Sequence, residues 1–62
     1  MDLNAAQLAF IAQVGGSTDQ VLQGGMAGEV FVYVQEPSQT VRYELTAQGE
    51  PRRVDTFRLA TV

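Results

Sequence analysis

The spacing of apolar residues changes once along this chain, near residue 29, and that change constrains the fold more than any other feature. In residues 3–14 apolar side chains recur at helical spacing, whereas after residue 29 they alternate with polar ones in three successive segments. Alternation with a period of two is typical of strands that bury one face. The sequence therefore predicts an α+β domain in which an N-terminal helix packs on a three-stranded antiparallel β-meander.

The helix is expected over about residues 4–14. Asn4 is suited to cap its first turn, and Gly15 can adopt the positive φ that often ends a helix. Four apolar side chains fall on one stripe, with Leu8 at its edge: Leu3, Phe10, Ile11 and Val14. We expect this stripe to pack on the sheet and the alanines of the opposite side to be exposed.

Residues 15–28 are expected to form a mobile connector, because five of the six glycines lie there. Ser17 and Gln20 have the spacing of a capping box, which favours a short helical turn through Leu22. A phosphate-binding loop is disfavoured, since this segment lacks the preceding strand and the Lys-Ser/Thr pair that such a loop needs.

Strands are expected over about residues 29–35, 40–47 and 52–60. Pro37 is suited to the turn between the first two, and Gln48-Gly49 has the composition of a two-residue hairpin between the second and third.

The register that follows from these turns is supported by charge. It places Arg42 opposite Asp55 and Glu44 opposite Arg53, and a slip by one residue would destroy both opposite-charge pairs. It also gathers seven side chains on the face expected to meet the helix: Val30, Val32, Val34, Val41, Tyr43, Leu45 and Val54.

The other face of the sheet is the candidate interaction surface, because it carries three of the five aromatic residues beside arginines. Its proposed contact residues are Phe31, Tyr33, Arg42, Arg53, Phe57 and Leu59. Such a face suits self-association, docking of another protein, or stacking of single-stranded nucleic acid. In a fourth interpretation the aromatic rings lie under the arginine side chains and nothing binds.

The composition disfavours catalysis. Histidine, cysteine and lysine are all absent, which removes the usual bases of nucleophilic triads and the imidazole and thiolate ligands of metals. The acidic residues show no spacing typical of a cation-binding loop. We therefore expect no catalytic residue, no cofactor and no metal site.

Charge and hydropathy bear on partners and location. The net charge of −3 disfavours non-specific binding to nucleic acid or to anionic membranes, which require a basic surface. The chain has no apolar run long enough to span a bilayer, and its N-terminus opens with Asp2 without the basic region of a secretory signal, so a cytoplasmic protein is expected.

The length of the chain favours self-association. A domain of 62 residues buries only roughly 60% of the surface of its unfolded chain, which leaves little core to stabilise it. The first and third predicted strands also leave free edges that can pair with another chain. We therefore expect a homodimeric, non-catalytic interaction module with a regulatory or accessory role, and single-stranded nucleic-acid binding is the alternative.

Overall fold

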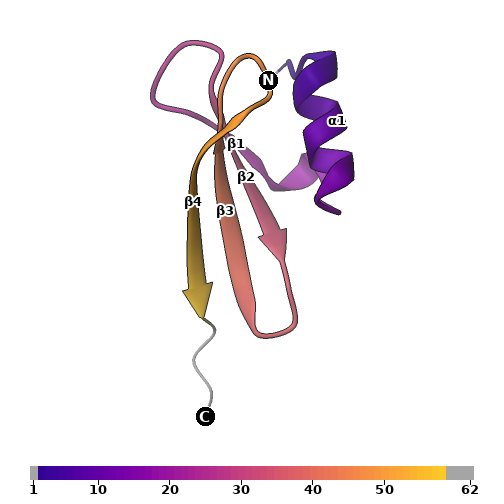
Figure 1. Cartoon of the computed structure of the whole chain (residues 1–62), viewed down its shortest axis with the longest axis vertical. Helices are drawn as coiled ribbons and strands as arrows, with labels where there is room; N and C mark the ends of the chain where they lie inside the picture. The colour runs from indigo at the N-terminus through magenta and orange to yellow at the C-terminus, as the bar shows by residue number, and fades with distance from the viewer. Residues whose placement is uncertain (1, 59–62) are drawn as a thin grey trace.

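The computed structural model describes residues 2–58, which form one α-helix, one short 3-10 helix and one antiparallel sheet (Figure 1). The elements in chain order are α1 (Ala5–Gln13), the 3-10 helix η1 (Thr18–Gln20), β1 (Val21–Gln23), β2 (Val30–Gln35), β3 (Gln39–Leu45) and β4 (Pro51–Arg58). The sheet order is β1-β2-β3-β4. The α+β class is confirmed, but the expected count of three strands is wrong because β1 adds a fourth.

The added strand lies within the segment expected to be a connector. The Ser17 side chain caps η1 by accepting a hydrogen bond from the Asp19 N–H, but the helical turn ends at Gln20 and does not continue through Leu22. Val21 is extended and pairs with Val32. This pairing supplies backbone hydrogen-bond partners and partly buries Val21 against the core, which outweighs the local preference for a helical turn.

Both ends of α1 follow the sequence prediction. The Asn4 side chain accepts a hydrogen bond from the Gln7 N–H, and the Gln7 side chain accepts one from the Asn4 N–H, which completes a capping box. At the other end Gly15 has φ +74°, and the Gly16 N–H donates to the Ile11 carbonyl at 2.9 Å. These contacts form a Schellman motif that ends the helix.

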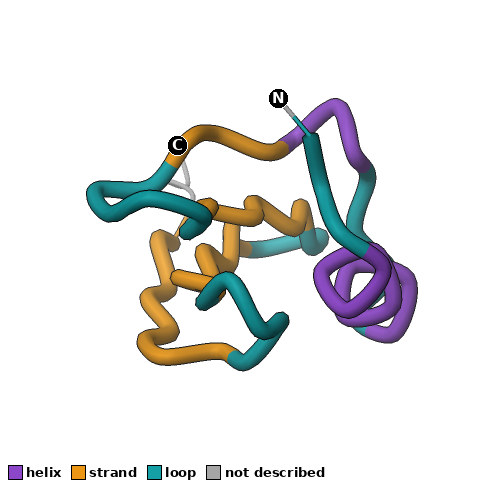
Figure 2. The backbone as a smooth tube through the Cα atoms, turned by 90° about the horizontal axis from the view of Figure 1, so that it is seen from above, coloured by secondary structure: helices purple, strands orange, loops and turns teal. Residues whose placement is uncertain are grey.

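The core lies between α1 and one face of the sheet. Viewed along the strands, α1 lies to one side of the sheet (Figure 2). The buried cluster consists of Ile11, Val30, Val32, Val34 and Leu45. The remaining stripe residues of the helix pack against this cluster, and Phe10 meets Tyr43 edge to face at 5.1 Å between ring centroids. Leu8, at the edge of the stripe, is exposed.

The helix does not reach the whole sheet. The described residues extend 39 Å along their longest axis, and the β2–β3 turn and the end of β4 project past α1 (Figure 1). Val54 was expected in the core but is 53% exposed. It lies on β4, the edge strand farthest from β1, which a single nine-residue helix does not cover.

The predicted register is confirmed, although the predicted hairpin turn is wrong. Glu44 lies opposite Arg53 and Arg42 opposite Asp55. The turn, however, has three residues, because the Thr46 N–H donates to the Glu50 carbonyl at 2.8 Å. This longer turn shifts the pairing of β3 with β4 by one residue, and a β-bulge in β4 restores the predicted register.

The bulge lies between two pairs of the β3–β4 ladder. Leu45 lies opposite Pro51 and Glu44 opposite Arg53, so Arg52 is the extra residue. The bulge turns the Arg52 side chain toward the face of the sheet that carries the candidate surface.

Candidate interaction surface

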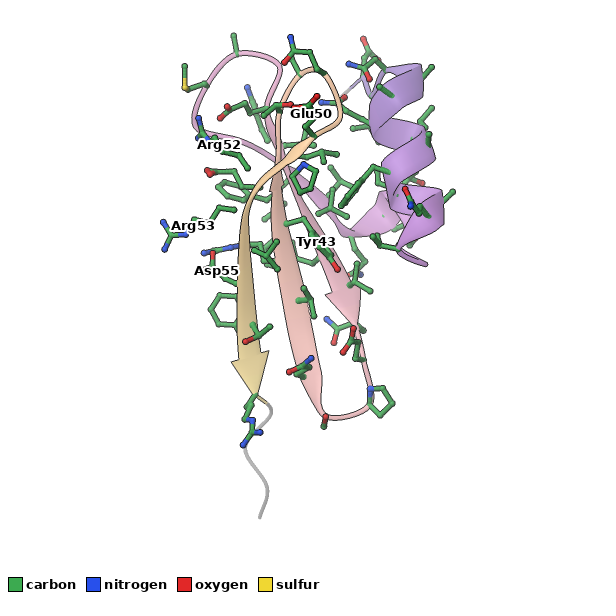
Figure 3. All side chains as sticks on the ribbon, in the orientation of Figure 1. Tyr43, Glu50, Arg52, Arg53 and Asp55 are labelled. Atoms are coloured by element: carbon green, nitrogen blue, oxygen red, sulfur yellow. The ribbon has the colours of Figure 1, made fainter. Side chains whose placement is uncertain are left out.

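The face of the sheet directed away from α1, here called the open face, carries the candidate site. Arg52, Arg53 and Asp55 point away from the helix, whereas Tyr43 points toward it (Figure 3). The cross-strand pairs and side-chain contacts assign nine residues to the open face: Leu22, Phe31, Tyr33, Arg42, Glu44, Arg52, Arg53, Asp55 and Phe57. Leu59, a sixth predicted contact residue, lies outside the described residues.

Arg42 lies at the centre of the open face, between two aromatic rings. Its guanidinium carbon is 5.2 Å from the centroid of Phe31 and 5.1 Å from that of Phe57. Phe31 comes from β2 and Phe57 from β4, so the contact joins three strands by way of β3. Both distances allow cation–π attraction. The structure thus brings together three of the predicted contact residues, and Tyr33 lies directly opposite Arg42.

An ion pair fixes the same guanidinium. Arg42 Nη2 lies 2.9 Å from Asp55 Oδ2, and the two side chains are 29% and 25% exposed. The hydrogen bond from Arg42 lowers the pKa of Asp55, against a smaller opposing effect of burial. The same bond raises the pKa of Arg42, and the neighbouring Tyr33 contributes in the same direction. Both groups are therefore held in their charged forms.

Arg53 does not bind the partner that its register predicts. Its Nε lies 3.3 Å from Asp55 Oδ1, while Glu44 binds Arg52 at 3.2 Å. The bulge is the physical reason. It places the side chain of the extra residue, Arg52, on the open face, where Arg52 forms the ion pair with Glu44 in place of Arg53. The Arg53 side chain remains 69% exposed.

Arg52 is a contact residue that the sequence analysis missed. It lies 3.0 Å from Glu29, a residue only 8% exposed, and Nη1 also lies 3.8 Å from the Met26 sulfur. The hydrogen bond to Glu44 and the charges of Glu29 and Glu44 raise the pKa of Arg52. Strict alternation along β4 places Arg52 on the helix side, so only the bulge reveals its position.

Exposed apolar side chains adjoin this charged network. Leu22 is 57% exposed, Met26 61% and Phe57 46%. Leu22 lies opposite Phe31 on the open face, and Met26 contacts Arg52. The sequence analysis missed Leu22 and Met26 because it assigned both to the connector.

The charges of the open face balance when Glu29, which binds Arg52, is counted with them. Three arginines, Arg42, Arg52 and Arg53, form ion pairs with three carboxylates: Glu29, Glu44 and Asp55. The surface therefore combines apolar groups with a neutral network of paired charges.

Other possible sites offer less chemistry. A hollow beside β2 is lined by Asp2, Gln23, Gly28, Glu29 and Val30, and its Glu29 carboxylate is already bound by Arg52. Within residues 2–58, no three His, Cys, Asp or Glu side chains gather where they could hold a metal ion. The same residues include no helix of the length and apolarity that a membrane span requires.

Comparison of the chain with protein-family models, curated proteins and solved structures finds no match.

Proposed function

We propose that this protein is a non-catalytic interaction module with a regulatory or accessory role, that it forms a homodimer through β4, and that the exposed apolar groups of the open face contact another protein. One observation carries the proposal: exposed Leu22, Met26 and Phe57 border a network of paired charges. Apolar and aromatic groups together with arginine are the side chains that protein interfaces favour. Phe57 is both an exposed aromatic residue and a cation–π partner of Arg42.

The charge balance favours a protein partner over nucleic acid. Single-stranded nucleic acid is bound by aromatic rings together with unpaired positive charge. Here Asp55 binds both Arg42 and Arg53, and the rings of Phe31 and Phe57 already contact Arg42. These contacts also agree with the interpretation in which the rings only pack against arginine. That interpretation does not account for the exposed Leu22 and Met26.

Sedimentation equilibrium across the micromolar range tests the proposal. We expect wild type to form a dimer and Phe57→Gln to dissociate it about tenfold more readily, since buried aromatic side chains dominate interface energetics. Ala9→Gln, on the exposed side of α1, is the matched control and leaves the association unchanged. A wild-type protein that stays monomeric contradicts the homodimer.

Titration with single-stranded oligonucleotides at low and high salt tests the alternative. Binding that weakens steeply with salt and is lost in Arg53→Gln would favour nucleic acid over a protein partner.

A further inference from the structure

The outer edge of β4 has free backbone groups. In the β2–β3 turn the Glu36 N–H donates to the Gln39 carbonyl, and in the next turn the Thr46 N–H donates to the Glu50 carbonyl. Because hydrogen-bonded and non-bonded pairs alternate in an antiparallel ladder, both turns make Arg42–Asp55 a bonded pair. Val54 and Thr56 consequently direct their N–H and C=O groups away from β3, where no strand pairs among the described residues.

The centre of this edge has no proline or bulge, and its two charged side chains, Arg53 and Asp55, already form an ion pair with each other. Proline, bulges and charged side chains protect strand edges. Pro51 and the bulge at Arg52 lie at one end of β4, and Arg58 lies at the other. Between them Val54 is 53% exposed and Thr56 is also exposed. The opposite edge of the sheet, β1, has only three residues.

We propose that a second copy of this chain pairs with β4 in antiparallel orientation, about a twofold axis at Val54. The inference rests on the proposed self-association and specifies its geometry. In this arrangement the two four-stranded sheets join into one of eight strands, and the two open faces become continuous. The bulge at Arg52 ends the regular part of the pairing in each copy.

Charge complementarity selects the register. With the axis at Val54, Arg53 of each copy lies opposite Asp55 of the other. Across the strands of the two copies, neighbouring side chains then alternate in charge. The order is Arg42 and Asp55 of one copy, followed by Arg53 and Glu44 of the second. Opposite charges at directly facing positions stabilise a pair of strands, and like charges destabilise it.

The neighbouring registers lack this match. An axis at Asp55 places the two Asp55 carboxylates opposite each other, and an axis at Thr56 places Asp55 opposite Phe57. The Val54 register also brings the two exposed Val54 side chains together on the other face of the sheet.

Single cysteine substitutions test the register directly, because the chain contains no cysteine. In the proposed dimer the two Val54 Cα atoms lie about 5.5 Å apart, within the range of a disulfide. The two Thr56 Cα atoms are offset by four residues along the strands, roughly 13 Å, which is too far. Under a glutathione redox buffer we expect Val54→Cys to form a disulfide-linked dimer and Thr56→Cys to remain at least tenfold less linked.

The possible outcomes separate the two proposals. Preferential linking of Thr56→Cys would overturn the register. If neither variant links while wild type sediments as a dimer, the β4 pairing is wrong and the homodimer stands. If wild type sediments as a monomer, both proposals fail.

A second pair of variants distinguishes edge pairing from stacking of two open faces. Val54→Pro removes an N–H that the monomer does not use, so it should abolish the dimer, whereas Val54→Thr should retain it. Leu22→Gln, at the opposite edge, should leave an edge-paired dimer unchanged. A tenfold loss of association in Leu22→Gln would overturn the edge geometry in favour of face-to-face stacking.

Discussion

Gln7 Nε2 donates a hydrogen bond to the carbonyl oxygen of Gly28 at 2.8 Å, which joins the first turn of α1 to the segment before β2. The same amide group donates to the Thr46 carbonyl at 3.2 Å, and Oε1 accepts from the Asn4 N–H. Gln7 is only 2% exposed. One buried amide thus caps the helix and holds two loops that are distant in sequence.

Replacing Gln7 with leucine should destabilise the fold. Leucine has a similar size but is apolar, so it leaves the Gly28 and Thr46 carbonyls without this partner, at a cost of about 1–3 kcal/mol in the free energy of unfolding. Denaturant unfolding followed by circular dichroism measures the change. Gln13→Leu, at an exposed position of the same helix, is the control, and an equal effect of both substitutions would contradict the role of the amide.

Gly49→Ala should destabilise the β3–β4 hairpin. Gly49 has φ +79°, and a Cβ there would lie 2.7 Å from the carbonyl carbon of Ala6. The positive φ and the close approach together should cost about 1–3 kcal/mol.

The matched control for Gly49 is Gly25→Ala. Gly25 lacks a positive φ, and a Cβ there would meet nothing within 4 Å. Thermal unfolding of the two variants should show a lower midpoint only for Gly49→Ala. A midpoint for Gly49→Ala equal to that of wild type would show that the hairpin relaxes without strain.

The sequence predicts the features of this fold that depend on local chemistry. The Asn4 cap, the positive φ of Gly15 and the pairing of Arg42 with Asp55 each follow from a few residues and were predicted correctly. β1 was not predicted, because glycines surround its three residues and its pairing with β2 decides its conformation.

Two contacts depended on tertiary structure that local patterns do not contain. The buried position of Gln7 requires the loops around Gly28 and Thr46 to meet the helix. The contacts of Arg52 depend on a bulge that moves it across the sheet. The pairing of Glu44 with Arg53 was predicted correctly from a wrong turn, because the extra residue of the loop and the extra residue of the bulge cancel in the register.

Arg52→Gln should destabilise the fold more than Arg53→Gln. Arg52 binds the nearly buried Glu29 as well as Glu44, so its removal leaves a buried carboxylate without its ionic partner. Arg53 has a more exposed side chain and binds an Asp55 that Arg42 also holds. Thermal midpoints of the two variants at low salt compare these effects. A larger fall in the thermal midpoint for Arg53→Gln would mean that the ion pair between Arg52 and Glu29 contributes little to stability.

Asp55 should give the fold a measurable sensitivity to acid. Its pKa in the folded chain is lowered from the ordinary value of 3.8, mainly by the hydrogen bond from Arg42. A carboxyl group whose pKa is lowered by folding stabilises the folded state above its unfolded pKa. That stabilisation is lost as the pH falls through the lowered value. The contribution of Asp55 is therefore complete above about pH 5 and declines below pH 3.8.

Asp55→Asn isolates this contribution, because the other carboxylates titrate in both proteins. The difference in unfolding free energy between wild type and Asp55→Asn should be constant near neutral pH and should shrink below pH 3.8. Added salt should reduce it further, since both partners are partly exposed and therefore screened. Denaturant titrations of both proteins at several pH values measure the difference. If it stayed constant from neutral pH to about pH 2, the ion pair with Arg42 would not be the source of the stabilisation.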